Sequence, residues 1–144
     1  MTRLIVVSNR LPVKVKRIDG ELQFSQSVGG LATGLESFYK SYDSLWIGWP
    51  GIASEDLRPG DKERIRSTLA ERNCHPVFLS HEQVSHYYHG FSNRTIWPVF
   101  SYFPQNAEYD DTNWQSYKEV NRVFCKSIKT VAKPEDAIWV HDYH

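Results

Sequence analysis

The sequence predicts an α/β domain with a doubly wound, mostly parallel, Rossmann-like sheet. Short apolar runs that end at loop residues predict buried parallel strands, and segments with apolar residues three or four positions apart predict amphipathic helices. The two patterns alternate along the chain, as they do in doubly wound sheets. With 144 residues, the chain is long enough for a single core without help from disulfides or metal. We therefore expect one domain over residues 1–144.

The first part of the chain contains a strand, a hairpin and a helix. The strand covers Leu4–Val7, a continuous apolar run. Apolar residues then alternate on both sides of an Asp-Gly pair at positions 19 and 20, which predicts a hairpin with a two-residue turn. Helical spacing over residues 31–42 places the preceding pair, Gly29 and Gly30, at a helix N-terminus.

The middle of the chain adds two strands and two helices. Leu45–Trp49 is the second strand and ends before a proline. Residues 60–73 predict a charged surface helix, and residues 75–79 predict a third strand. Ser80 and Gln83 form a capping-box pattern, which predicts the start of a short helix.

The last part of the chain contains the clearest helix. We expect the short helix to end at Gly90, and the stretch Phe91–Tyr102 is harder to assign. A long amphipathic helix begins with Asp111 or Thr112 as its cap and ends before a proline. The fourth strand covers Ala137–Val140.

Composition excludes several classes of protein. Hydrophobic residues make up 40% of the chain and aromatic residues 14%, which is too apolar for a disordered segment. The formal net charge is zero, from 17 basic and 17 acidic residues, and no apolar run approaches the roughly 18 residues of a membrane span. We therefore expect neither nucleic acid nor a membrane as a partner. Cys74 and Cys125 make no disulfide framework and no signal peptide precedes them, so we expect a cytoplasmic protein.

Two ionisable side chains follow predicted strands. Ligands of doubly wound sheets bind beyond the carboxyl ends of the strands. Arg10 follows the first strand and Asp142 the last, so both belong to that edge. The Arg10 guanidinium suits a phosphate or carboxylate, although a solvated or salt-bridged arginine is the alternative. Asp142 can accept hydrogen bonds from two sugar hydroxyls, or it caps the strand end.

A glycine pair and an aromatic stretch are further candidates. Gly29 and Gly30 would let the backbone approach a diphosphate, but the segment lacks the lysine of a P-loop and also fits an ordinary loop-to-helix junction. The stretch "HYYHGFSNRTIWP" combines aromatic faces with hydrogen-bonding groups, a combination suited to a sugar ring. Core packing is the alternative for Tyr87, Tyr88 and Trp97.

The histidines raise the question of a metal site. His86 and His89 are three residues apart, and His141 and His144 repeat that interval. No cysteine or carboxylate accompanies either pair at a familiar spacing. We therefore expect no metal and no cofactor.

Five motifs together resemble the N-terminal part of the trehalose-6-phosphate synthases. The motifs are, in order, "VVSNRLPV", "SVGGLATGL", "WIGWPG", "YYHGFSNRTIWPVF" and "IWVHDYH". The resemblance implies a two-domain GT-B glycosyltransferase that moves glucose from UDP-glucose to glucose 6-phosphate with retention and without a metal. In that fold, residues 1–144 would form an incomplete acceptor-side domain without the C-terminal donor-binding domain, and we expect them to be inactive alone.

The same resemblance gives roles to residues of the acceptor site. Arg10, Tyr88 and Asp142 match the family's glucose 6-phosphate contacts. Trp97 matches the aromatic residue that shapes the acceptor pocket, and Trp49 lines the same cleft. The physical roles agree, because a guanidinium neutralises phosphate, a carboxylate fixes hydroxyls and aromatic rings cover sugar faces.

The resemblance also leaves alternatives open. Gly29 and Gly30 match the loop that touches UDP-glucose, and no residue is identified as a dedicated catalytic base. Ser101 stands where a histidine is usual, and Phe103–Asp111 departs from the family pattern. A related synthase that glucosylates another phosphorylated polyol, such as glycerol phosphate, is therefore one alternative. A non-catalytic sugar-phosphate-binding module is the other, and homo-oligomerisation stays open.

Overall fold

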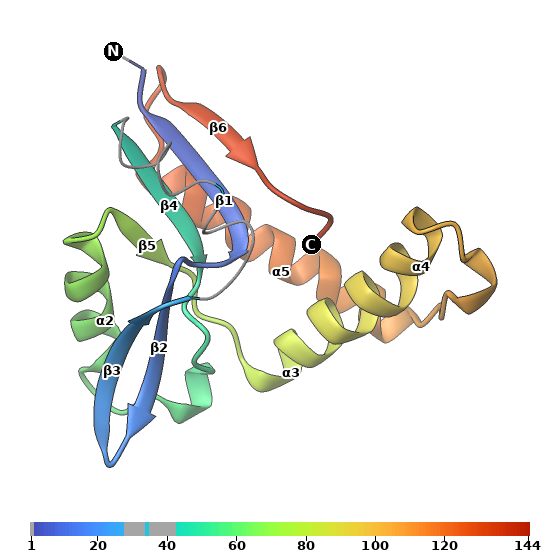
Figure 1. The fold of residues 1–144 in the computed structure, drawn as a ribbon, viewed down its shortest axis with the longest axis horizontal. Coiled ribbons are helices and arrows are strands. Elements are labelled where there is room, and N and C mark those ends of the chain that lie inside the picture. Colours follow the sequence, from blue (N-terminus) through green and yellow to red (C-terminus); the bar gives the residue numbers. More distant parts are fainter. Residues whose placement is uncertain (1, 28–33, 35–42) are drawn as a thin grey trace.

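A four-stranded parallel sheet forms the centre of the fold (Figure 1). The structure is a computed structural model and describes residues 2–27, 34 and 43–144. The strands of this sheet, in spatial order, are β5 (Cys74–Pro76), β4 (Ser44–Trp49), β1 (Leu4–Arg10) and β6 (Ala137–Val140). The predicted α/β fold with a mostly parallel sheet is confirmed.

Helical segments connect and cover the strands. In chain order they are η1 (Ser54–Asp56), α2 (Asp61–Ala70), α3 (His81–Gln83), η2 (Val84–Ile96), α4 (Trp97–Phe100), η3 (Pro104–Asn106) and α5 (Asp111–Val131). None of the helices in the described part of the chain has the combination of length and apolarity that a membrane span needs.

The order of the strands reverses at β1. From β1 the chain moves outward to β4 and β5, and it then returns to add β6 on the other side of β1. A crevice forms at such a reversal because the connections from the two strands leave in opposite directions. The carboxyl ends of β1 and β6 therefore mark the expected ligand position.

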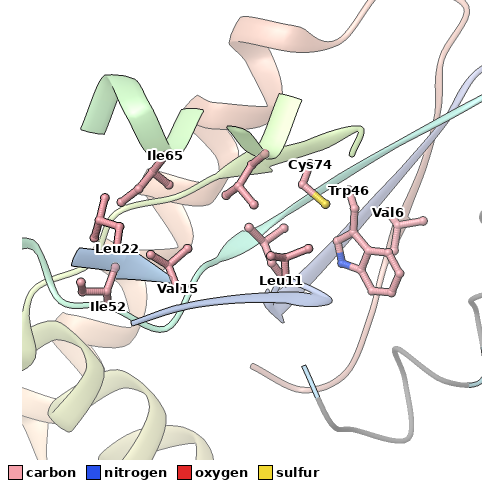
Figure 2. Close-up of a cluster of buried hydrophobic side chains, with 10 residues drawn as sticks. Val6, Leu11, Val15, Leu22, Trp46, Ile52, Ile65 and Cys74 are labelled. Carbon is pink, nitrogen blue, oxygen red and sulfur yellow. The ribbon is translucent and has the colours of Figure 1, made fainter. Parts of the chain in front are cut away.

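The two faces of the sheet bury different cores. Val6 and Trp46 point to one face, where they join residues of α2 and of the hairpin of β2 (Val13–Ile18) and β3 (Glu21–Gln26) (Figure 2). Ile5, Val7 and Ile47 point to the other face, where they join residues of α5. This alternation follows the two-residue period of a strand, and it means that helices cover both faces of the sheet.

The predicted hairpin is present as β2 (Val13–Ile18) and β3 (Glu21–Gln26), paired antiparallel. Asp19 and Gly20 connect the strands with φ angles of 51° and 81°. Positive φ at both central residues defines the turn type that matches the twist of two paired strands. The Asp-Gly pair therefore predicted both the place and the form of this turn.

The predicted bounds of β1 and β5 were wrong. β1 extends beyond Val7 to Arg10, so Arg10 is the last residue of the strand and does not follow it. β5 covers Cys74–Pro76 and not residues 75–79. Beyond Pro76, the Val77 backbone N–H still donates to the Gly48 carbonyl oxygen at 2.8 Å, and Val77 and Leu79 are buried just outside the strand.

Gly90 does not end a helix. The capping box of Ser80 and Gln83 begins α3 as predicted, but the helical path continues as the π-helix η2 through Gly90 and into α4. A Cβ on Gly90 would lie 2.6 Å from the Cγ of Asn113 in α5. The glycine therefore serves the close packing of η2 on α5, a contact that its own neighbours in the sequence do not reveal.

The clearest predicted helix is confirmed. α5 runs over Asp111–Val131, and the Asp110 side chain accepts a hydrogen bond from the Asn113 backbone N–H as its N-cap. The cap is therefore one residue earlier than predicted. The fourth strand is β6, as predicted. The helix expected over residues 31–42, together with Gly29 and Gly30, lies outside the described residues, apart from position 34.

Candidate functional site

Arg10 lies at the carboxyl end of β1, against the ring of Trp49. The guanidinium carbon is 5.1 Å from the centroid of that ring, a cation–π distance. Burial lowers the pKa of Arg10, and the nearby Tyr88 hydroxyl partly offsets that effect. Among residues 2–27, 34 and 43–144, no carboxylate forms an ion pair with Arg10. The salt-bridge alternative therefore finds no partner in the described part of the chain.

The Trp49 ring packs against the Arg10 guanidinium. Its side chain is only 9% exposed, and its indole N–H donates to the carbonyl oxygen of Ile52 at 3.0 Å. This hydrogen bond fixes the ring plane on which Arg10 rests. Trp49 also contributes to the wall of an adjoining hollow of about 260 Å³ that reaches His89.

Asp142 has one carboxylate oxygen occupied and the other available. Its Oδ1 accepts the backbone N–H of Tyr143 at 2.9 Å, and its Oδ2 is 3.7 Å from Nδ1 of His144. The residue has a φ of 69°, in the left-handed region that aspartate tolerates better than most residues. Asp142 therefore caps the strand end through Oδ1. Its side chain is 46% exposed, and Oδ2 stays available for a further hydrogen bond.

Tyr88 connects Arg10 to the segment after β6. Its ring stacks on His144, with ring centroids 4.9 Å apart and an angle of 26° between the planes. Tyr88 is also close enough to Arg10 to raise the pKa of the guanidinium. An arc that joins Arg10, Tyr88, His144 and Asp142 therefore spans the carboxyl ends of β1 and β6.

Trp97 extends this arc from the start of α4. Its ring stacks on Tyr143 at 5.3 Å between centroids, and its side chain is 53% exposed. Tyr143 is held from two sides, because its hydroxyl donates to Asn93 Oδ1 at 3.2 Å and its carbonyl oxygen accepts from the Tyr117 hydroxyl at 3.1 Å. Trp97 thus offers an accessible aromatic face next to Asp142.

Tyr87 is a core residue, in contrast to Tyr88. It is 2% exposed, and burial raises the pKa of its hydroxyl. That hydroxyl donates to Asn9 Oδ1 at 2.6 Å. Core packing, one of the two interpretations that the sequence allowed, therefore describes Tyr87, whose polar end supports the residue before Arg10.

A cavity of about 190 Å³ lies at the strand reversal, between β1, β6 and α5. Asn9, Cys125, His141 and His144 contribute to its lining. Within the described residues, the Nε2 atoms of both histidines are buried and have no hydrogen-bond partner. Burial lowers the pKa of both imidazoles, and the Asp142 carboxylate partly offsets this effect. Burial therefore favours the neutral form of both rings, which can accept or donate a hydrogen bond.

The described part of the chain contains no group of three or more metal-ligating side chains. The two histidine pairs that raised the question have other contacts. His86 Nδ1 lies 2.8 Å from Asn113 Oδ1, and His144 stacks on Tyr88.

The structure brings five of the seven predicted site residues to one edge of the sheet: Arg10, Trp49, Tyr88, Trp97 and Asp142. The other two, Gly29 and Gly30, lie outside the described residues. Sequence reasoning missed Asn9 and Tyr143 and considered His144 only as a metal ligand. Their position directly after predicted strands was the available signal, since strand ends converge at this edge.

Sequence similarity extends over nearly the whole chain. The sequence model of Glycosyltransferase family 20 matches residues 2–144. The chain is 44% identical over 144 residues to a UDP-forming alpha,alpha-trehalose-phosphate synthase of Botryotinia fuckeliana, a match that covers 99% of this chain and 27% of that protein.

The fold is also similar to solved structures. A UDP-forming alpha,alpha-trehalose-phosphate synthase from Burkholderia xenovorans, in complex with glucose-6-phosphate, matches with a TM-score of 0.68 at 26% identity and covers 99% of this chain and 28% of that chain. A protein from E. coli, named for trehalose-6-phosphate and bound with UDP-2-fluoro glucose, matches with a TM-score of 0.70 at 29% identity over the same shares. The chain therefore spans 27–28% of the length of these relatives.

Proposed function

The chain belongs to Glycosyltransferase family 20, a family of glycosyltransferases, and from that membership we propose that it binds the acceptor of a trehalose-6-phosphate synthase. In the complete enzyme, glucose passes from UDP-glucose to glucose 6-phosphate with retention at the anomeric carbon. The names of the relatives support this choice of product, and the ligands named for two solved relatives support the choice of acceptor and donor.

One observation carries the proposal from the chain itself. Arg10 is a half-buried cation with no acidic partner among the described residues, and it stands at the strand reversal where doubly wound sheets bind ligands. An unpaired guanidinium presents a planar fork of donors that matches the oxygens of a phosphate. The partly exposed ring of Tyr88 lies near it. The exposed ring of Trp97 and the available Asp142 Oδ2 lie at the same edge of the sheet, and a phosphorylated sugar requires such groups.

Each site residue then has a defined role. Arg10 binds the phosphate and Trp49 fixes the plane of its guanidinium. Tyr88 and Trp97 cover the faces of the sugar ring, and Asp142 Oδ2 accepts a hydrogen bond from a ring hydroxyl. Orientation of the acceptor hydroxyl toward the donor is the contribution of this chain to catalysis.

Donor binding completes the proposal. Gly29 and Gly30 approach the UDP-glucose, and a C-terminal domain that is not among residues 1–144 holds the diphosphate. The acceptor hydroxyl attacks on the face from which UDP departs, and the donor phosphate takes its proton, so that the chain needs no dedicated general base. The donor-binding domain stabilises the departing diphosphate electrostatically.

The proposal separates acceptor binding from turnover. We expect calorimetric titration of this 144-residue chain to detect glucose 6-phosphate, with weaker binding of glucose and of glycerol phosphate. The same chain should release no measurable UDP from UDP-glucose and glucose 6-phosphate, because the donor-binding domain is missing from the assay. Turnover at the rate of an ordinary synthase would refute the proposal that this chain binds the acceptor while a separate domain binds the donor. A preference for glycerol phosphate would favour the related synthase.

Asp142→Asn tests the role of the available carboxylate oxygen. Asparagine keeps the oxygen that accepts the Tyr143 N–H and tolerates the φ of 69°, so the melting temperature should stay the same. It places an NH2 donor where Oδ2 accepted a hydroxyl. We expect glucose 6-phosphate to bind roughly fivefold more weakly, since a charged acceptor contributes about 1 kcal/mol more than a neutral one.

Calorimetry of both proteins measures this difference, and Asp142→Gly is the matched control. Glycine accepts the same φ but has neither oxygen, so its loss of affinity should be at least as large as that of asparagine. Unchanged affinity in Asp142→Asn would leave Asp142 as a strand-end cap and nothing more.

A further inference from the structure

Arg10 reaches the site because β1 contains a bulge. In the register with β4, Val7 pairs with Ile47 and Arg10 pairs with Trp49. Two residues of β1, Ser8 and Asn9, therefore stand opposite the single residue between those partners. Two residues against one is the definition of a β-bulge, a feature that often re-aims a side chain beside an active site.

The bulge changes the face of the sheet on which Arg10 lies. Side chains alternate along a strand, and a one-residue slip moves every later side chain to the opposite face. Val6 lies in the core on the α2 face, so in a regular strand Arg10, an even number of residues later, would also point there. With the bulge, Arg10 pairs with Trp49, which belongs to the α5 face. The bulge thus delivers the cation to the side of the sheet that carries Tyr88 and the segment after β6.

A buried hydrogen-bond relay fixes the first residue of the bulge. The indole N–H of Trp46 donates to Ser8 Oγ at 2.7 Å, and the Ser8 hydroxyl donates to the carbonyl oxygen of Arg10 at 2.7 Å. Trp46 is 1% and Ser8 is 5% exposed, so water offers little competition. The relay ties the backbone of Arg10 to the rigid core shown in Figure 2.

The second residue of the bulge is held from the other face. Asn9 Oδ1 accepts the hydroxyl of buried Tyr87 at 2.6 Å. Ser8 and Asn9 point to opposite faces, as successive residues of a strand do, and each is bonded by an aromatic side chain of its own core. The bulge is therefore held from both cores of the domain.

We propose that Ser8 is a positioning residue for acceptor binding: through the Trp46–Ser8–Arg10 relay, it holds the bulge that places the Arg10 guanidinium on the ligand side of the sheet. This inference rests on the proposed role of Arg10 in binding the phosphate. The Ser8 hydroxyl is engaged by Trp46 and by the carbonyl oxygen of Arg10, so in this proposal it acts through Arg10.

The test is a double-mutant cycle in this chain with glucose 6-phosphate as the probe. Ser8→Ala removes the hydroxyl that links Trp46 to Arg10, and we expect the affinity to fall roughly fivefold to tenfold. In an Arg10→Ala background the same substitution should cause no further fall, because residues that act as one unit are not additive. Ser8→Thr keeps the hydroxyl and should retain most of the affinity.

A substitution elsewhere in the core distinguishes a positioning role of Ser8 from a general loss of fold stability. Ile65→Val removes a methyl group from α2 in the cluster that contains Trp46, and it should lower the melting temperature without changing the affinity. Equal losses of affinity from Ser8→Ala in the wild-type and Arg10→Ala backgrounds would overturn the proposal. So would wild-type affinity in Ser8→Ala.

A spectroscopic measurement keeps the test independent of the proposed function. In ¹H–¹⁵N spectra, Ser8→Ala should shift the indole resonance of Trp46, which loses its acceptor, and that of Trp49, on which Arg10 rests. If the wild-type chain fails to bind glucose 6-phosphate, the proposed acceptor site falls, and a shifted Trp49 resonance still supports the relay. An unmoved Trp49 resonance overturns the relay whether or not the sugar phosphate binds.

Discussion

Arg10→Ala is expected to weaken glucose 6-phosphate binding by about tenfold to a hundredfold. A charge-assisted hydrogen bond contributes about 1.5–3 kcal/mol, and each 1.4 kcal/mol corresponds to a factor of about ten in affinity. The loss should be confined to ligands that carry a phosphate. Titrations with glucose 6-phosphate and with glucose measure this selectivity, because in the proposed site glucose would make the same contacts with Asp142, Tyr88 and Trp97 but has no group for the guanidinium.

Fold stability should change much less than affinity in Arg10→Ala. The substitution removes the contact with the Trp49 ring, which is worth about 0.5–1 kcal/mol, or a few degrees in melting temperature for a domain of this size. Arg10→Lys is the matched control. It keeps the charge but loses the planar fork and the stacking surface, so its affinity should lie between those of wild type and alanine. Equal losses for glucose 6-phosphate and glucose would make Arg10 a structural residue.

The elements that sequence analysis predicted well have local causes. The hairpin follows from an Asp-Gly pair that adopts positive φ at both positions, and α5 follows from its apolar stripe. The capping box at Ser80 and Gln83 is likewise contained in four consecutive residues. In each case the residues that determine the structure are neighbours in the sequence, so their pattern is sufficient.

The elements that sequence analysis predicted poorly depend on contacts between residues that are distant in the sequence. Gly90 has the sequence signature of a helix end, yet η2 continues through it because the glycine lies against Asn113 of α5. The bulge in β1 has no signature of its own in "VVSNR", since it is defined by the register with β4. For the same reason, the predicted strand ended at Val7 and the observed one ends at Arg10.

The candidate site also contains residues with a local sequence signal and residues without one. Arg10 and Asp142 were predicted because each lies at the end of a strand, and the strand ends could be located from the sequence. The contribution of His144 depends on its stacking against Tyr88, and that of Asn9 depends on the hydroxyl of Tyr87. Both partners come from η2, a segment that the sequence analysis assigned only in part, so these contacts had no local signal.

Gly48→Ala is expected to destabilise the fold by about 2–3 kcal/mol, near the upper end of the usual cost of overpacking. A Cβ at this position would lie 2.9 Å from the carbonyl oxygen of Ser8, 3.0 Å from the backbone nitrogen of Leu11 and 3.1 Å from the carbonyl carbon of Arg10. All three are backbone atoms of or next to the bulge, so no side-chain rotation relieves the contact. For a domain of this size, the loss corresponds to a fall of roughly 5–10 °C in melting temperature.

The same substitution should also weaken glucose 6-phosphate binding, at temperatures where the fold is intact. Relief of the new methyl group needs a shift of backbone, and the three atoms that it meets belong to or adjoin the bulge, which sets the face on which Arg10 lies. Gly34→Ala is the matched control, because a Cβ there would meet no atom of the described residues within 4 Å, and its melting temperature should equal or slightly exceed that of wild type. If Gly48→Ala lowers the melting temperature and leaves the affinity unchanged, strain at the bulge does not reach the guanidinium. The rigid link between β4 and Arg10 would then be wrong, even with Arg10 itself still bound to the phosphate.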